Sequence, residues 1–366
     1  MTALSTPTTP ARAAAEPSDG WLIRWCERGW LPDGLVRAGM RALMCQRLRD
    51  EGIHDGELRS RRFNALLDEL QSSPIAIETD AANTQHYELP PAFFEAHLGP
   101  QLKYSCALYH TGSETLAEAE KAMFACYAER AGLADGQCIL DLGCGWGSLS
   151  LWMAKCYPNA RIVALSNSQG QRSWIEARAA ERGLTNLSVH TGNIVDFEFA
   201  DMSEGGRFDR VVSVEMFEHM KNYGLLLGKI ARWMRPDAVL FVHIFAHRTL
   251  AYHFRVQTGT DWMSKYFFTG GTMPSEALLL HFQDDLRVTR QWWLGGMHYA
   301  RTADHWLANL DAARSRLMPV FTQTYGERNA AVWFQRWRMF YLAVSTLFGY
   351  AGGNEWGVAH YRLVKR

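Results

Sequence analysis

The stretch CILDLGCGWG, residues 138–147, decides the fold of this chain of 366 residues. It begins as a short apolar strand that reaches Asp141, and a turn rich in glycine follows at once. Apolar residues then recur at helical spacing from 149 to 154. A strand, a glycine-rich turn and a helix in this order are typical of the first unit of a doubly wound α/β sheet, in which ligands bind at the carboxyl ends of the strands.

Strands and helices alternate along the chain beyond this turn. Apolar runs bounded by polar turns predict strands over 138–141, 161–166, 187–191, 208–214, 239–245, 288–294 and 357–364. Helical patterns over 169–182 and 225–234 lie between them. Together they predict a Rossmann-like α/β fold with a doubly wound, mostly parallel seven-stranded sheet, whose last strand is antiparallel.

The rest of the chain divides into segments of different character. Residues 1–20 are rich in Ala, Ser, Thr and Pro and predict a disordered tail, and residues 21–82 predict a helical N-terminal cap. The predicted sheet lies in a domain over 83–366. Two segments of this domain, about 247–286 and the helical insertion at about 303–346, interrupt the alternation, and we expect them to cover the substrate.

The overall composition limits the partners and the compartment. The 38 Lys and Arg balance the 38 Asp and Glu, so net charge favours neither nucleic acid nor an anionic bilayer. No run approaches the ~20 apolar residues of a membrane-spanning helix. Scattered cysteines without a C-x-x-C pair fit a reducing compartment. We expect a cytoplasmic protein with no integral membrane association and no metal site; its oligomeric state stays open.

The residues around the glycine turn indicate which ligand it binds. Asp141 directly precedes the glycines, where a carboxylate can bond an ammonium group. A nicotinamide site has an acidic residue about 20 positions further on, which holds the ribose hydroxyls. Here the second strand ends in ALSNS, residues 164–168, without an acid. This pattern favours S-adenosyl-L-methionine over a nicotinamide dinucleotide as the cofactor.

A cluster of titratable residues follows the fourth strand in VEMFEHM, residues 214–220. Glu215, Glu218 and His219 are expected at the carboxyl edge of the sheet, beside the cofactor. Carboxylates and an imidazole there can accept a proton, which a protonated amine must lose before its nitrogen can react. Acids at this position are also typical of an ordinary helix N-terminus, so the residue types alone leave both interpretations open.

Seven stretches of the chain, taken in order, carry a family pattern. They are QHYELP at 85–90, LKYSC at 102–106, DLGCGWGS at 141–148, SNSQGQ at 166–171, MFEHMKNYG at 216–224, YFFTGGTMP at 266–274 and FGY at 348–350. With them, the chain resembles the cyclopropane-fatty-acid-synthase superfamily of class I methyltransferases and, within it, the coclaurine N-methyltransferase-like branch. The resemblance covers about 83–366 and implies an S-adenosylmethionine-dependent methyltransferase whose acceptor is a small-molecule amine.

The resemblance also implies roles for single residues. It implies cofactor contacts from Tyr104, Ser105, Asp141, Gly143, Gly145, Ser166, Gln171, Asn193 and Ile194. It implies that Glu218 or His219 is the base, with Glu215 beside them. It further implies that Trp337 and Phe340 form aromatic walls of the acceptor site.

Two alternatives stay open. In the other branch of the superfamily the acceptor is an alkene in a phospholipid acyl chain, and a bicarbonate ion held by a Cys, a Glu and a His removes the proton. Cys106, Glu218 and His243 are candidates for such a site, and His243 departs from the amine pattern, whereas the two glutamates and FGY at 348–350 favour an amine. The alternative from another class is a non-catalytic protein that binds S-adenosylmethionine.

Overall fold

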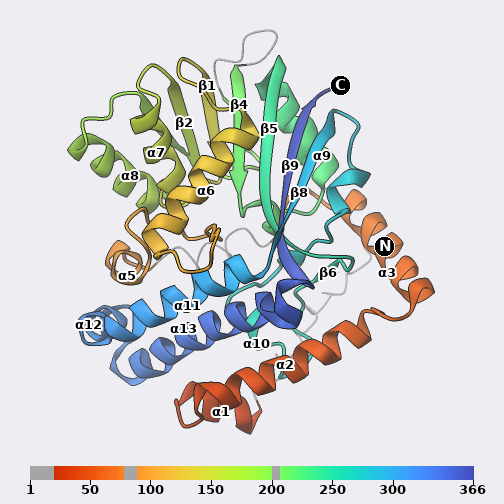
Figure 1. Ribbon diagram of the computed structural model, residues 1–366, viewed down its shortest axis with the longest axis vertical. Helices are drawn as coiled ribbons and strands as arrows, with labels where there is room; N and C mark the ends of the chain where they lie inside the picture. Colours follow the sequence, from red (N-terminus) through yellow and green to blue (C-terminus); the bar gives the residue numbers. More distant parts are fainter. Residues whose placement is uncertain (1–19, 78–88, 200–206) are drawn as a thin grey trace, which may run out of the picture.

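The computed structural model describes residues 20–77, 89–199 and 207–366. Seven strands form one sheet in the order β3-β2-β1-β4-β5-β9-β8 (Figure 1). They are β1 (Cys138–Leu142), β2 (Arg161–Ser166), β3 (Leu187–Thr191), β4 (Phe208–Val214), β5 (Met234–His247), β8 (Leu286–Gly295) and β9 (Trp356–Lys365). β1 to β5 pair in parallel, and β9 runs antiparallel to both of its neighbours. The predicted α/β fold with its mostly parallel sheet is confirmed.

β5 begins earlier than the sequence predicted. Met234 lies opposite Phe208, but the next register pair joins Val239 to Arg210, so β5 carries the extra residues of a bulge. Pro236 lies within this irregular stretch, where its missing N–H leaves no ladder position unsatisfied. In the sequence, Arg235-Pro236-Asp237 is typical of a turn that precedes the apolar run, which explains the difference.

Helices cover both faces of the sheet. They are α6 (Leu116–Ala131), α7 (Ser148–Cys156) and α8 (Gln169–Glu181), with α3 (Gly56–Ser72) and α9 (Tyr223–Trp233). Successive strand residues point to opposite faces: Ile139 belongs to a core with α6 and α7, and Leu140 to a second core with α3 and α9. Burial on both faces is why the parallel strands are continuous apolar runs.

A layer of helices lies against the carboxyl ends of the parallel strands, in the lower half of Figure 1. The predicted helical insertion consists of α11 (Met297–Ala312), α12 (Arg314–Tyr325) and α13 (Glu327–Phe348). α5 (Pro91–His97) packs against α11 and α12, and α1 (Trp21–Glu27) and α2 (Asp33–Asp50) contact α13. Helices α1 and α2 therefore lie on this layer, whereas α3 lies beside α9.

The segment that follows β5 is mostly irregular. It contains β6 (Tyr252–His253), α10 (Trp262–Tyr266), β7 (Thr272–Met273) and the 3-10 turn η2 (Leu278–His281). Two further 3-10 turns, η1 (Phe217–His219) and η3 (Tyr350–Gly353), follow β4 and α13. The tail predicted at 1–20 lies outside the described residues, apart from Gly20.

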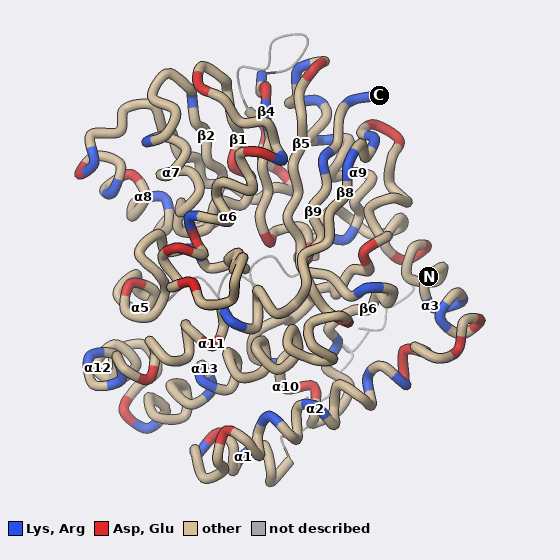
Figure 2. The backbone as a smooth tube through the Cα atoms, viewed as in Figure 1, with Lys and Arg blue, Asp and Glu red and all other residues tan. Residues whose placement is uncertain are grey.

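Charged residues of both signs are spread along the described part of the chain. Figure 2 shows Lys, Arg, Asp and Glu interspersed along the outer helices, with few in the middle of the strands. Among the described helices, none has the length and apolar character that crossing a membrane requires.

The turn between β8 and α11 fixes where α11 begins. Gly296 is buried there, and a Cβ on it would lie 2.1 Å from the carbonyl oxygen of Phe348 and 2.2 Å from that of Trp356. Its N–H donates to the carbonyl of Gly353. Only glycine fits, because main-chain atoms approach from both sides. The turn thereby places Tyr299, in the first turn of α11.

We expect Gly296→Ala to destabilise the protein by about 1–3 kcal/mol, the usual cost of overpacking. Gly39→Ala is the matched control, because Gly39 lies inside α2 and a Cβ there meets nothing within 4 Å. The control should stabilise the protein by up to about 1 kcal/mol. Urea unfolding followed by circular dichroism measures both, and equal stability of the two variants would contradict the steric argument.

Candidate active site

Two neighbouring cavities lie at the carboxyl edge of the sheet. With the space that is open to solvent included, the larger contains about 900 Å³ of empty space and the smaller about 710 Å³. Gly143, Gly145, Glu215 and His219 line both of them, so the cavities meet at the glycine turn and the end of β4. These are the two segments from which the sequence predicted cofactor binding and proton transfer.

The residues predicted to bind the cofactor divide between the two cavities. Tyr104, Ser105 and Asp141 line the larger one, Ser166, Gln171, Asn193 and Ile194 the smaller one, and Gly143 and Gly145 both. They come from the segment before α6, from the carboxyl ends of β1 and β2, from α8 and from the loop after β3. The fold therefore brings all nine together around one continuous region.

The main chain of the glycine turn lines both cavities. Gly143 and Gly145 have φ angles of +80° and +51°, a conformation that glycine adopts without strain. A Cβ on Gly143 would lie 2.7 Å from Cγ of Met216. The N–H groups of Gly143 and Cys144 both donate to the carbonyl of Leu165, which holds the turn against β2.

Asp141 presents a buried carboxylate to the larger cavity. It is 2% exposed, and its Oδ2 accepts a hydrogen bond of 2.5 Å from the hydroxyl of Ser150. Burial raises the pKa of Asp141 to about 6, and the bond from Ser150 opposes this shift. A cation such as an ammonium group beside Asp141 would restore the charged form that burial disfavours.

Hydroxyl and amide groups, rather than acids, provide the polar contacts of the smaller cavity. Oγ of Ser166 donates to Oε1 of Gln171 at 2.6 Å and accepts from the N–H of Ser168. Nε2 of Gln171 is buried and has no hydrogen-bond partner among the described residues. A buried unpaired donor is costly, so this amide fits a ligand with hydroxyl groups. Together with Asp141, the donor set fits the amino-acid and ribose ends of S-adenosylmethionine.

A buried amine fixes the wall formed by the segment before α6. Lys103 is 2% exposed, and its Nζ donates to Oγ of Ser105 and, at 2.6 Å, to the carbonyl of Cys106. Burial lowers the pKa of Lys103 to about 8, against the attraction of nearby acidic groups. These bonds hold Ser105 and the adjoining Tyr104 at the edge of the larger cavity.

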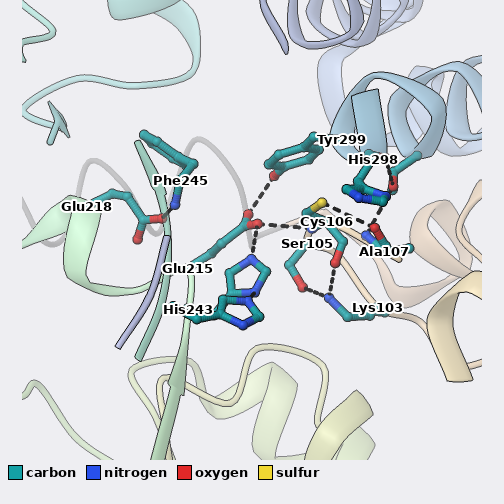
Figure 3. A network of polar contacts seen from close by, with 12 residues as sticks. Lys103, Ser105, Cys106, Ala107, Glu215, Glu218, His243, Phe245, His298 and Tyr299 are labelled. Atoms are coloured by element: carbon teal, nitrogen blue, oxygen red, sulfur yellow. Dashed lines mark hydrogen bonds and ion pairs between the residues drawn. The ribbon is translucent and has the colours of Figure 1, made fainter. Parts of the chain in front are cut away.

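Three donors from different parts of the chain hold the carboxylate of Glu215 (Figure 3). Oε1 accepts from the N–H of Cys106 at 3.0 Å and lies 3.1 Å from Nε2 of His243, and Oε2 accepts from the hydroxyl of Tyr299 at 2.5 Å. The φ of Glu215 is +50°, an uncommon conformation for a non-glycine residue, and such strain is typical of functional sites. Burial raises the pKa of Glu215, whereas the charge of Lys103 and the bonds from Cys106 and Tyr299 oppose the shift.

His219 and Glu218 lie differently although they are adjacent. His219 lines both cavities with its ring parallel to that of Phe268, and burial lowers its pKa to about 4. Glu218 lines neither: Oε1 accepts from the N–H of Phe245 at 2.8 Å, and Oε2 has no partner among the described residues. Burial raises the pKa of Glu218 well above the usual carboxyl value. Its role as base stays a prediction, and the geometry favours His219.

Aromatic and apolar side chains form the apolar wall of the larger cavity. They are Phe245, Phe268, Tyr299, Trp306, Phe340 and Val344. Phe340 thus lies where the sequence predicted an aromatic wall. Trp337 does not line the cavity: it packs in the core behind the wall, with its ring centroid 5.1 Å from that of Phe267 and 4.7 Å from that of Phe93.

Several residues take part in the site only through others, or were not predicted. Cys106 and His243 line neither cavity and reach the site by their bonds to Glu215. Tyr299 was not predicted, because it is 84 positions from Glu215 and lies in a helix start without a motif. Lys103 was also not predicted, although it lies in the LKYSC stretch that carries the family pattern.

Among the described residues, no group of three His, Cys, Asp or Glu is placed to hold a metal ion.

Known proteins are similar to this chain in sequence and in fold. The family model of mycolic acid cyclopropane synthetase matches residues 76–347. (S)-Coclaurine N-methyltransferase of Thalictrum flavum subsp. glaucum is 38% identical over 349 residues, which cover 94% of this chain and 95% of that protein. Cyclopropane-fatty-acyl-phospholipid synthase of Escherichia coli (strain K12) is 28% identical over 329 residues, 88% of this chain and 75% of that protein. A crystal structure of coclaurine N-methyltransferase bound to N-methylheliamine and SAH matches with a TM-score of 0.89 at 36% identity, covering 94% of this chain and 99% of that one.

The raised pKa of Asp141 predicts a pH-dependent gain in stability for Asp141→Asn. The folded pKa of about 6 lies above the unfolded value, so the wild type loses stability as the pH rises from about 4 to about 6. The variant has an uncharged side chain at position 141. Its free energy of unfolding should exceed that of the wild type by about 2–3 kcal/mol near pH 7.5 and by almost nothing near pH 4. Urea unfolding at several pH values measures this difference.

Asp135→Asn provides the control with the opposite sign. The bonds from Asn159 lower the pKa of the exposed Asp135, so its replacement should bring no gain near neutral pH. A difference between wild type and Asp141→Asn that does not change with pH would contradict a titrating, buried Asp141.

Proposed function

This chain belongs to the mycolic acid cyclopropane synthetase family and is an S-adenosylmethionine-dependent methyltransferase, and from that premise we propose that it methylates the nitrogen of a small-molecule amine. One observation carries the proposal: the carboxylate of Glu215 lies where the two cavities meet, and three donors hold it. A fixed negative group attracts a protonated amine and gives an uncharged alkene no favourable contact. The 38% identity to (S)-coclaurine N-methyltransferase supports the same acceptor class.

The residues around the glycine turn hold and orient the cofactor. S-adenosylmethionine, when bound, supplies a methyl group that its sulfonium already activates for transfer. Asp141 would hold its ammonium group, Tyr104 and Ser105 its carboxylate, and Ser166 and Gln171 its ribose hydroxyls. Asn193 and Ile194 would flank its adenine. Fixing the donor in this way contributes to the rate by removing translational and rotational freedom before the reaction.

Glu215 and the apolar wall bind the amine. The hydroxyl of Tyr299 and the N–H of Cys106 stabilise the ionised form of Glu215, which then attracts the ammonium form of the acceptor. The rings of Phe268 and Phe340 line the same cavity and can face a positive charge. The binding site therefore selects a cationic group with apolar, aromatic surroundings.

His219 accepts the proton that the bound amine must lose. Its low pKa keeps the imidazole neutral near pH 7, so a ring nitrogen has a lone pair free. The N–H bond of the ammonium breaks, an N–H bond forms on His219, and the amine keeps the electron pair with which it reacts. The charge of Glu215 raises the pKa of His219 and thereby stabilises the imidazolium that results.

The groups that would bind bicarbonate in the lipid alternative already form hydrogen bonds within the chain. The N–H of Cys106 and Nε2 of His243 both bond to Oε1 of Glu215, and Glu218 accepts from the main chain of Phe245. A free bicarbonate ion would have to displace a carboxylate of the chain itself. The residues present therefore do not fit a bound bicarbonate, and this supports the amine.

Transfer of a labelled methyl group from S-adenosylmethionine tests the proposal. The purified protein is incubated with a panel of tetrahydroisoquinoline-type amines and, separately, with vesicles of unsaturated phospholipid. Label in the amine is expected. Label in the extracted lipid, or cofactor binding by calorimetry with no transfer to either acceptor class, would overturn it in favour of the lipid enzyme or the non-catalytic protein.

Replacement of His219 separates the candidate bases. His219→Gln should lower kcat by about 10²–10⁴, the usual contribution of a general base, with the affinity for SAH unchanged. Glu218→Gln is the matched comparison: burial favours the uncharged form of this carboxyl, and the amide oxygen of the glutamine can still accept from the N–H of Phe245, so kcat should fall by less than about tenfold. A larger loss in Glu218→Gln than in His219→Gln would assign the base to Glu218.

A further inference from the structure

A row of hydrogen-bonded side chains leads away from Glu215 across the sheet. Nε2 of His243 lies 3.1 Å from Oε1 of Glu215, and Nδ1 of His243 lies 2.8 Å from Nε2 of His360. Nδ1 of His360 lies 2.6 Å from Nη1 of Arg130. His243 and His360 are direct cross-strand partners on β5 and β9, and Val214, the residue before Glu215, pairs with His243. The row therefore follows the sheet from the site to α6.

Arg130 is the outer end of the row, and it is held in place. Its guanidinium lies 4.9 Å above the ring of Trp292 on β8, the strand next to β9. Trp292 and His360 are register partners, so the stacked arginine reaches the histidine directly. Arg130 is partly exposed, whereas His243 and His360 are fully buried. A surface-side cation thus contacts a polar row that ends in the active site.

The chemistry of arginine gives the row a direction. A guanidinium only donates hydrogen bonds, so Nδ1 of His360 must be the acceptor. A neutral imidazole with an accepting Nδ1 carries its hydrogen on Nε2, which then donates to Nδ1 of His243. By the same step, Nε2 of His243 carries the hydrogen that is donated to Glu215. Each tautomer follows from the one before, and the row ends by donating to the carboxylate.

Both histidines are neutral, as this argument requires. Burial lowers the pKa of His243 and His360 well below the usual imidazole value, and the positive charges of Lys103 and Arg130 act in the same direction. The other titratable groups that face the row are Lys103 and Cys106 from the segment before α6, Tyr127 of α6, Tyr299 of α11 and His219 of η1. Tyr127 places its hydroxyl 2.9 Å from Nδ1 of His243, so it is a second donor that shares the single lone pair of this nitrogen with His360.

We propose that Arg130 is a positioning residue for the amine site: through His360 and His243 it sets the imidazole tautomer that donates to Glu215. The functional part of this inference rests on the proposed amine methylation, whereas the tautomers do not. The direction of the row also has a consequence for the proton. Because every nitrogen that faces Glu215 along the row is already a donor, the row stabilises the carboxylate and offers no path by which a proton leaves it.

Arg130→Met tests the proposal with a direct spectroscopic readout. Methionine keeps an apolar stem over Trp292 but removes the donor, and Arg130→Lys restores a donor. Arg248→Met is the matched control, because Arg248 stacks over Trp293 on the same strand at 5.3 Å but contacts neither histidine. Long-range ¹H–¹⁵N correlation spectra of the histidine side chains, assigned with His243→Gln and His360→Gln, report each tautomer and need no acceptor.

The wild type and Arg248→Met should show His243 and His360 each as the single tautomer with hydrogen on Nε2. Arg130→Met should lose the single tautomer at His360, and Arg130→Lys should recover it. Given an amine substrate, Arg130→Met should raise its KM on the order of tenfold with the affinity for SAH unchanged. Folding of each variant is checked by its circular dichroism and melting temperature.

Unchanged tautomers in a folded Arg130→Met protein would overturn the proposal and leave Tyr127 as the group that orients His243. Correct tautomers in the wild type, together with no methylation of any amine, would instead remove the proposed function and keep the structural part of the inference. An equal rise of KM in Arg248→Met would also contradict the positioning role of Arg130, since that variant leaves the row of hydrogen bonds intact.

Discussion

The site depends on one carboxylate in a strained position. Glu215 has a φ of +50° directly after β4, and its two oxygens accept from a main-chain N–H, an imidazole and a phenol. No one of these donors is local to Glu215 in the sequence. The strain of such a conformation costs on the order of 1–3 kcal/mol and persists only where the surroundings determine it. Here three separate segments do so, and they meet at the larger cavity.

The sheet topology explains how those segments meet. The parallel strands bring Asp141 and Glu215 to one edge, and the antiparallel strand β9 places His360 beside His243. The same strand supplies the carbonyl of Trp356 that closes on Gly296 and so sets the start of α11 and the place of Tyr299. Helices α11 and α13 then supply Tyr299, Trp306, Phe340 and Val344 to the apolar wall. The candidate site is thus assembled at the ends of regular elements together with the irregular segments before α6 and after β5.

Much of the fold and half of the site follow from local sequence patterns. Strand β1, the glycine turn and Asp141 are contiguous, so period and turn chemistry are enough to predict them. Glu215 and His219 follow β4 directly, and their place at the sheet edge needs only the strand assignment. Tyr299 and the bond between Arg130 and His360 carry no such signal, because they arise from contacts between residues 84 and 230 positions apart. Trp337 was predicted to form the aromatic wall together with Phe340, which lies on the same helix, but the ring of Trp337 is buried in the core. The position of a residue on a helix does not by itself show which side its ring faces.

The hydrogen bonds from Cys106 and His243 to the carboxylate of Glu215 bear on whether the reaction needs a dissolved anion. A carboxylate joined to the backbone is present at every turnover, whereas a dissolved anion has to be captured from the medium at a rate set by its concentration. If the protein methylates an amine as proposed, its turnover should therefore not depend on the concentration of dissolved bicarbonate.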